Sequence, residues 1–599
     1  MGTKCCARVL RTASCPPNWR GQLRYAVPSL AGVLRTVLRT KECTEDMWRT
    51  SRKPTTLALM LGVGIIVVWA WLSAPALAQT GATSLAPEAE AGKQLYMDRC
   101  QHCHGENGDG KGVSAAVVYP KPRDFTSGIY KFRTHHETAN GNKMAGDEDI
   151  FRSINDGLHA TSMPAWGGFY NRQQIGQLVA YVKTFASVFQ DDKPGAALDF
   201  SGEIPSSPAS IAKGKEHFEK TFECSTCHGI AGRGNGQQAI DGLKDDWGER
   251  IWPANLTKPW TYRGGHTRRD IFRNMALGIT GTPMPAFADP DPMAAAREPG
   301  IDTQRKKDAE ALAREVRENI WHTVNYVQSL WTYPEEPEVK STLTAKMVAG
   351  PLPAGPDDAV WKKAPINYYP LVGQVIEEPR LFTPLIVGVE IQAVHNGKEI
   401  AFRVVWDDRT ESKPGGSGNT ETFADAMALQ FPAKPLEGSE RPYFLMGDGK
   451  RPTNLWYWRN DTDSLDKAVL VQTTGSKSFQ PGDNPGGLRA QGVVDNGQYR
   501  VVLQRTLRTK NAGQEVQFGV GQFLPFSITT WDGSNGERGG GKRTVMAWYN
   551  LYLEPERSKA PMYLWGLGIV VGVILQFSAY YMTRKSQNQS NTVMETGRS

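Results

Sequence analysis

The sequence predicts a multidomain chain with two all-α domains, then an all-β antiparallel sandwich, then one C-terminal transmembrane helix. Its 599 residues allow about three or four domains. Three observations predict this fold class. The N-terminal half contains a repeated block with apolar residues at helical spacing, residues 351–556 contain short strand-like runs, and an uncharged apolar run lies near the C-terminus.

The first 78 residues differ from the rest of the chain in charge. They contain 11 of the 69 Lys and Arg residues and 3 of the 62 Asp and Glu residues, so the remainder carries 58 basic and 59 acidic side chains. Composition therefore gives no support for a nucleic-acid-binding surface. The apolar run 60–72, basic residues before it and Ala-Leu-Ala at 76–78 predict a cleaved export signal, with an uncleaved anchor as the alternative. Met47 would begin a signal of ordinary length, so it is the possible true start.

The predicted mature chain contains four cysteines, and all four lie in two C-x-x-C-H motifs. The motifs are Cys100-Gln-His-Cys103-His104 and Cys224-Ser-Thr-Cys227-His228. This spacing is the attachment signature of c-type haem, in which both thiols bind the haem covalently and the histidine is an iron ligand. A redox dithiol does not need the histidine, and a zinc site needs four ligands close together, so two covalent haems c are the preferred interpretation.

The residues after each motif repeat as well. Both copies contain Asp-Ile-Phe-Arg, at 149–152 and 270–273, and both end in Met-Pro-Ala. The methionine follows the motif histidine by 59 residues in the first copy and by 56 in the second. This pattern resembles class I cytochrome c domains, and the resemblance implies that Met163 and Met284 are the distal iron ligands. Met144 is the alternative in the first copy.

Amphipathic stretches frame each copy. Residues 89–100 and 175–189 enclose the first copy, with Gly92 and Tyr96 at the expected helix crossing, and residues 211–222 and 309–330 enclose the second. Charged, proline-containing linkers near 190–205 and 333–350 separate the domains. We therefore expect cytochrome c domains at 86–192 and 205–335, with the charged segment 289–307 as a surface insertion.

The third domain is predicted from a change in the residue pattern near residue 351, where long stretches of helical periodicity end. Runs rich in β-branched and aromatic residues alternate with Gly, Pro, Asn and Asp turns through residue 556. Asn396-Gly397 lies between two such runs and indicates a hairpin. The pattern is typical of an antiparallel sandwich. Its tryptophans at 406, 456 and 458 are expected in the core.

Several blocks of this domain resemble a known family. The blocks are 401–408, 424–432, 443–448, 454–459 and 531–542. They look like the haem b subunit of ethylbenzene dehydrogenase and related gamma subunits of type II molybdenum enzymes of the dimethyl sulfoxide reductase family. The resemblance implies one non-covalent haem b between Met446 and Lys542. Lys510 is the alternative for the second ligand.

The apolar run 561–582 is about 22 residues long and uncharged, which is enough to cross a bilayer as a helix. Arg584 and Lys585 follow it, so the positive-inside rule predicts a cytoplasmic tail at 583–599. We expect a single-pass protein of the cytoplasmic membrane with the bulk of the chain in the periplasm.

The fusion of these parts resembles the membrane-anchored gamma subunits of nitrite oxidoreductases. The resemblance implies electron transfer between the respiratory chain and a partner enzyme with a molybdopterin-containing catalytic subunit and an iron–sulfur subunit. A cytochrome c or an oxidase would be the acceptor, and this chain would need no catalytic site of its own. Two alternatives remain: a free-standing exported dihaem enzyme, and a dihaem cytochrome fused to a carbohydrate-type binding sandwich.

Overall fold

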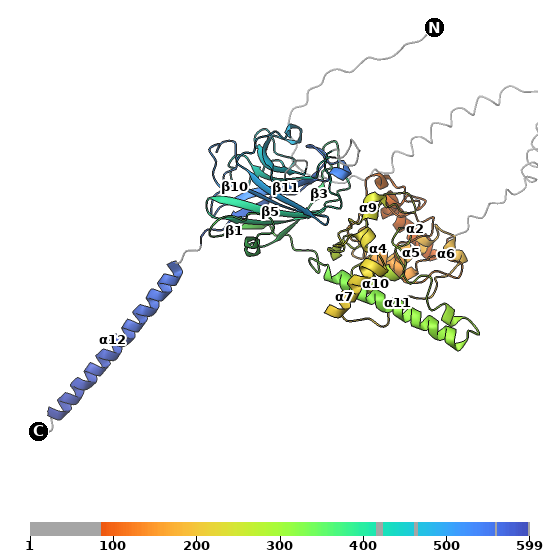
Figure 1. The fold of residues 1–599 in the computed structure, drawn as a ribbon, viewed down its shortest axis with the longest axis horizontal. Coiled ribbons are helices and arrows are strands. Elements are labelled where there is room, and N and C mark those ends of the chain that lie inside the picture. Colours follow the sequence, from red (N-terminus) through yellow and green to blue (C-terminus); the bar gives the residue numbers. More distant parts are fainter. Residues whose placement is uncertain (1–84, 415–422, 461–464, 557–559, 597–599) are drawn as a thin grey trace, which may run out of the picture. The chain divides into compact units, whose positions relative to one another are not determined.

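The computed structural model describes residues 85–414, 423–460, 465–556 and 560–596. The predicted export signal, 1–78, and the possible start at Met47 lie outside the described residues. Helices form the first half of the described chain and strands form most of the second, as Figure 1 shows by colour. The predicted order of two helical cytochrome c domains, a β domain and one apolar C-terminal helix is confirmed.

Each helical domain encloses its C-x-x-C-H motif between terminal helices. The α-helices of the first domain are α2 (Pro87–Arg99), α3 (Gln101–His104), α4 (Asp147–Asn155), α5 (Arg172–Lys183) and α6 (Val188–Asp191). Those of the second are α7 (Pro208–Glu216), α8 (Ser225–His228), α9 (Gln237–Gly242), α10 (Arg268–Ala276) and α11 (Thr303–Ser329). A π-helical turn, His217–Thr221, follows α7.

A glycine allows the terminal helices to cross closely in both copies. At Gly92 of α2 an added Cβ would lie 1.9 Å from the carbonyl oxygen of Gln177 in α5. At Gly214 of α7 it would lie 2.0 Å from the carbonyl oxygen of His322 in α11. Because no side chain fits into such gaps, both positions require glycine. An aromatic residue four positions later, Tyr96 or Phe218, is buried beside each crossing.

The β domain is a sandwich whose two sheets share one strand. The strands are β1 (Thr342–Met347), β2 (Asn367–Pro370), β3 (Val372–Gly373), β4 (Gly388–His395), β5 (Glu399–Asp407), β6 (Ala426–Pro432), β7 (Thr453–Arg459), β8 (Ala468–Thr473), β9 (Arg489–Asp495), β10 (Gln498–Thr506), β11 (Phe523–Trp531), β12 (Thr544–Val545) and β13 (Tyr549–Leu553). The main order is β8-β7-β6-β11-β13-β1-β4-β5-β10-β9, with β2 beside β4 and a separate β12-β3 pair. The first half of β11 pairs with β13 and its second half with β6, so β11 turns the corner between the sheets.

The apolar faces of the two sheets meet in one core. Trp406 of β5 lies 6.0 Å from Trp458 of β7 between ring centroids, and Phe402 of β5 lies 5.7 Å from Trp456 of β7. All four side chains are buried, which confirms the expected core role of the tryptophans. The Asn396-Gly397 turn joins the antiparallel strands β4 and β5 as predicted.

Two details of the sandwich differ from the sequence-based expectation. Strand β1 lies inside the segment 333–350 that composition assigns to a linker. It pairs in parallel with both β4 and β13, so the sheet is not wholly antiparallel. The charged and proline-containing residues around this strand made the segment resemble a linker, but Leu343 and Ala345 of the strand are completely buried.

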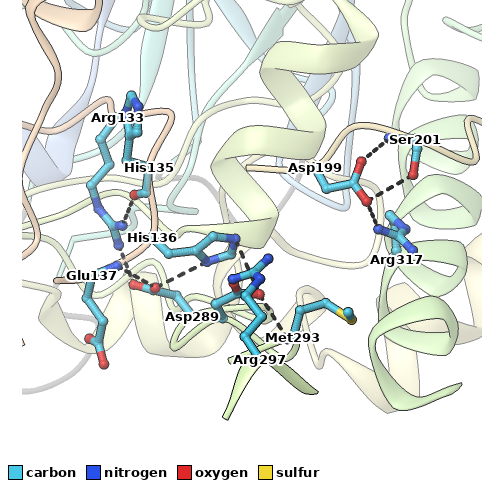
Figure 2. Close-up of polar contacts among 11 residues, drawn as sticks. Arg133, His135, His136, Glu137, Asp199, Ser201, Asp289, Met293, Arg297 and Arg317 are labelled. Carbon is cyan, nitrogen blue, oxygen red and sulfur yellow. Dashed lines mark hydrogen bonds and ion pairs between the residues drawn. The ribbon is translucent and has the colours of Figure 1, made fainter. Parts of the chain in front are cut away.

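The expectation that 289–307 is a surface insertion is wrong at its start. Asp289 is completely buried and pairs with the equally buried Arg133 of the first cytochrome c domain at 2.5 Å. Figure 2 shows this pair beside His136 and Glu137. The His136 ring faces the Asp289 carboxylate, and the backbone N–H of Glu137 donates to it. Arg133 also donates to the carbonyl oxygen of Leu277 in the second copy. A buried ion pair therefore joins the two helical domains.

The C-terminal helix α12 (Ala560–Thr596) contains the predicted apolar run. The helical segment 563–588 is long enough and apolar enough to cross a membrane. The described apolar side chains of this segment, Trp565 and Phe577 among them, are exposed rather than packed on a protein core.

Candidate haem sites

The first C-x-x-C-H motif forms the short helix α3, whose histidine is held by a backbone carbonyl and an aromatic ring. His104 Nδ1 lies 3.1 Å from the carbonyl oxygen of Arg123, and its ring stacks on Phe125 at 4.4 Å. The ring is thus held by Nδ1, which leaves Nε2 as the atom available to a metal. Cys100 and Met163 pack against the same apolar core.

The second motif repeats this arrangement with different neighbours. His228 Nδ1 lies 3.0 Å from the carbonyl oxygen of Ala254, the residue that corresponds to Arg123 in the first copy. Cys224 and Met284 pack against the core of the second domain. A backbone carbonyl holds each histidine ring through Nδ1, so both rings have the same anchor although the side chains at 123 and 254 differ.

Burial favours the neutral imidazole that an iron ligand requires. It lowers the pKa of the His104 and His228 imidazoles, despite the backbone hydrogen bond that each ring makes. Burial also raises the pKa of Cys100 and Cys224 to about 12. A redox-active dithiol needs a lowered thiol pKa, so the structure argues against that alternative.

A zinc site finds no support in the described part of the chain. There, the motif cysteines and histidines do not gather with a third His, Cys, Asp or Glu ligand around one point. A structural zinc ion needs four such ligands. The donor set that remains in each copy fits a haem c: two cysteines, one oriented histidine and one methionine.

The two candidate methionines lie in equivalent turns. The backbone N–H of Met163 donates to Thr161 Oγ1, and that of Met284 donates to Thr282 Oγ1. Both side chains are half-buried, as expected for a thioether at the edge of a ligand site. The competing Met144 is only 1 % exposed and has no equivalent in the second copy.

Met446 occupies a strained and buried position in the sandwich. Its φ of +66° is in the left-handed region, which costs a residue with a side chain about 1 kcal/mol or more. The side chain is completely buried among Tyr457, Phe479 and Trp531. Strain at a buried methionine is a feature that tertiary structure must stabilise, and such positions cluster at functional sites.

The loop that contains Lys542 folds over the same aromatic group. Trp531 donates from Nε1 to the carbonyl oxygen of Gly539 in this loop. The half-buried Lys542 donates from Nζ to the carbonyl oxygen of Asn535 at 2.5 Å. The alternative Lys510 is exposed after β10. Trp531 thus packs in the same cluster as Met446 and donates a hydrogen bond to the Lys542 loop.

The sandwich is fastened to the second helical domain beside its histidine. Asp407, at the end of β5, pairs with Lys258 at 2.8 Å and with Arg233 at 3.3 Å. It also accepts a hydrogen bond from Asn255, the neighbour of the carbonyl that holds His228. Burial opposes ionisation, but these cations lower the pKa of Asp407 to about 2. Sequence reasoning missed this contact and the Arg133–Asp289 pair, because both join residues more than 140 positions apart.

Three family models match separate parts of the chain. The ethylbenzene dehydrogenase model covers residues 358–480, the model for subunit III of cbb3-type cytochrome c oxidase covers 87–182, and the cytochrome c model covers 211–331.

Three curated relatives are gamma or heme subunits of reductases and a dehydrogenase. The chlorate reductase gamma subunit of Ideonella dechloratans is 30% identical over 36% of this chain and 86% of its own length. A putative respiratory nitrate reductase heme subunit of Haloferax mediterranei is 26% identical over 37% of this chain and 78% of its own. The dimethylsulfide dehydrogenase gamma subunit of Rhodovulum sulfidophilum is 25% identical over 35% and 78%.

Proposed function

This chain belongs to the family of haem-binding gamma subunits of molybdenum oxidoreductases, to which the chlorate reductase gamma subunit also belongs, and from that premise we propose that it transfers electrons for such an enzyme. The observation that carries this proposal is the combination of the family's β domain with two cytochrome c domains in one chain. Bound haem would supply the one-electron redox chemistry. The residues of the chain orient each haem and set its environment.

In the cytochrome c domains, we propose one covalent haem on Cys100 and Cys103 and a second on Cys224 and Cys227. His104 and Met163 would hold the first iron, and His228 and Met284 the second. Support comes from the matched geometry of the two copies, in which a backbone carbonyl orients each histidine through Nδ1. A thioether ligand opposite histidine raises the reduction potential, which suits a carrier rather than an oxygen-activating site.

In the sandwich, we propose one non-covalent haem b between Met446 and Lys542. The buried, left-handed position of Met446 and the lysine loop folded over Trp531 support this assignment. The lysine must be neutral to act as a ligand, and a neutral amine that gives its lone pair to iron still has N–H groups for the Asn535 carbonyl.

We propose a nitrite oxidoreductase as the partner enzyme, with a molybdopterin-containing catalytic subunit and an iron–sulfur subunit. Support comes from the resemblance of this fusion, two cytochrome c domains with a β domain and an apolar helix, to the gamma subunits of nitrite oxidoreductases. It favours a nitrite oxidoreductase over a chlorate reductase, a nitrate reductase or a dimethylsulfide dehydrogenase as the partner. Helix α12 would anchor the chain to the cytoplasmic membrane, with the cytochrome and β domains in the periplasm. A cytochrome c or an oxidase would exchange electrons with the haem c end.

A pyridine haemochrome spectrum of the purified full-length chain tests the cofactor assignment, since it separates haem b from haem c. We expect two haems c and one haem b per chain. Two haems c without haem b, from cells with ample haem supply, would refute the role of the β domain and favour a binding sandwich. Affinity purification from the native membrane tests the partner: the eluate should contain molybdenum and oxidise nitrite with an artificial electron acceptor.

A further inference from the structure

Three buried aspartates, none of them a proposed haem ligand, gather at one end of the sandwich. Asp408 follows β5, Asp425 precedes β6 and Asp532 follows β11. Each contributes a carboxylate oxygen to a group in which the oxygens lie within 4.8 Å of one another. Their exposed fractions are 3%, 0% and 1%. Sequence reasoning gave these residues no role, although each adjoins the end of a strand.

The described side chains compensate the charge of this group only in part. Among the described residues, no lysine or arginine forms an ion pair with any of the three aspartates. Arg409 is next to Asp408 in sequence and attracts Asp408 and Asp532 electrostatically, but its guanidinium lies over the Trp252 ring at 5.4 Å. Three carboxylates would therefore share a buried site with one cation near them and none paired to them, which is a costly arrangement.

Two oxygens in and near this group receive no hydrogen bond from the residues that the structure describes. Asp425 is satisfied, since Gly533 N–H, Ser412 N–H and the Tyr499 hydroxyl donate to it. Asp408 Oδ2 is buried and accepts no hydrogen bond from any described residue.

The second unpartnered oxygen comes from a neutral residue. Asn460 is completely buried, and its Nδ2 donates to the Tyr499 hydroxyl that in turn donates to Asp425. Within the described part of the chain its Oδ1 has no hydrogen-bond partner. A cation would satisfy such unpartnered oxygens in and near an anionic group.

We propose that Asp408, Asp425 and Asp532, with the Asn460 amide oxygen, bind a divalent cation of the calcium type. All of the donors are oxygens, which excludes the nitrogen and sulfur preference of zinc and copper. Calcium takes oxygen ligands at about 2.3–2.6 Å, so two oxygens on opposite sides of the ion lie about 4.6–5.2 Å apart. The spread of this group matches that shell.

Such an ion would join parts of the sandwich that are distant in strand order. Asp425, Asn460 and Asp532 extend the adjacent strands β6, β7 and β11, whereas Asp408 extends β5 of the facing sheet. Asp532 also begins the loop that leads to Lys542, and its carboxylate accepts the N–H of Asn535. The cation would thus fix the base of the lysine loop. Its binding does not depend on the proposed function, although this last consequence does.

The test uses the full-length holoprotein in detergent, freed of loose metal by gel filtration. Elemental analysis should find about one calcium per chain in addition to haem iron. Unfolding of the β domain should occur about 5 °C higher in 1 mM CaCl2 than in EGTA, as expected for a ligand well above its dissociation constant. Asp408→Asn should abolish both the bound calcium and the shift. Asp357→Asn, an exposed aspartate of the same domain, should retain both.

The alternative is that the three carboxyls share protons and bind no ion. In that case EGTA would have no effect, and Asp408→Asn would be as stable as the parent or more stable. That outcome overturns the proposal, as does a tightly held zinc ion that calcium does not displace. If Asp408→Asn does not fold, the elemental analysis and the EGTA comparison on the unaltered protein still decide. A missing haem b with calcium present would refute the haem assignment and leave the cation site intact.

Discussion

Replacing Asp289 with asparagine should weaken the junction between the two cytochrome c domains. The side chains of Arg133 and Asp289 are both inaccessible to solvent and lie 2.5 Å apart. Asparagine keeps an oxygen for the N–H of Glu137 but leaves Arg133 as a buried cation without its counter-ion. Loss of one partner from a buried pair costs about 3–5 kcal/mol. Arg133 retains its bonds to the carbonyl oxygens of Leu277 and His135, so we expect about 3 kcal/mol.

The pH dependence gives an independent magnitude. Burial alone would raise the pKa of Asp289, but the His136 ring, the Glu137 N–H and Arg133 outweigh it and lower the pKa to about 2. With an ordinary value near 3.8, the difference corresponds to about 2 kcal/mol. Because the folded-state pKa is lowered, this stabilisation is complete above about pH 4 and is lost as the pH falls toward 2.

Thermal and denaturant unfolding of the holoprotein, followed by haem absorbance and circular dichroism, measures this loss. The matched control is Glu148→Gln, which removes an exposed ion pair with Arg172 and should cost less than about 1 kcal/mol. At pH 7 Asp289→Asn should be clearly less stable than the control, and the difference should shrink below pH 4. Equal stability of the two variants at pH 7, or a difference that does not depend on pH, would refute the reasoning.

Three further predictions follow from the same structure. Met284→Ala should lower the reduction potential of the second haem c by on the order of 0.1 V while the first is unchanged, which a redox titration of the purified protein resolves. Gly214→Ala should lower the unfolding midpoint because its Cβ would overlap a backbone carbonyl. The control is Gly176→Ala in α5, where the Cβ meets nothing within 4 Å and should raise the midpoint slightly. Equal effects would contradict the conclusion that Gly214 is needed where α7 crosses α11. Lys542→Met should alter the optical and paramagnetic spectra of haem b while Lys510→Met leaves them unchanged, and the reverse result would assign the ligand to Lys510.

Local patterns determined much of this protein. Two C-x-x-C-H motifs within a repeat predicted two helical cytochrome c domains, because covalent attachment needs its residues at fixed short spacing. Alternating apolar residues and the Asn396-Gly397 turn predicted β4 and β5, because hairpin pairing is local. Strand β1 escaped prediction, since its neighbours β4 and β13 lie about 50 and 200 residues further along the chain. Its alternating apolar residues become buried only when these distant strands pair with it.

The sequence by itself therefore determined the domain order, the two C-x-x-C-H motifs and the apolar helix, all of which depend on residues close together in the chain. Tertiary structure alone decided which polar groups meet across domains. Arg133 and Asp289 read as ordinary surface charges until folding buries them together. Asp408, Asp425 and Asp532 stand at three separate strand ends, and only strand pairing and the closure of two sheets bring their carboxylates into one group. Burial and juxtaposition are non-local properties, so no spacing rule in the sequence encodes them.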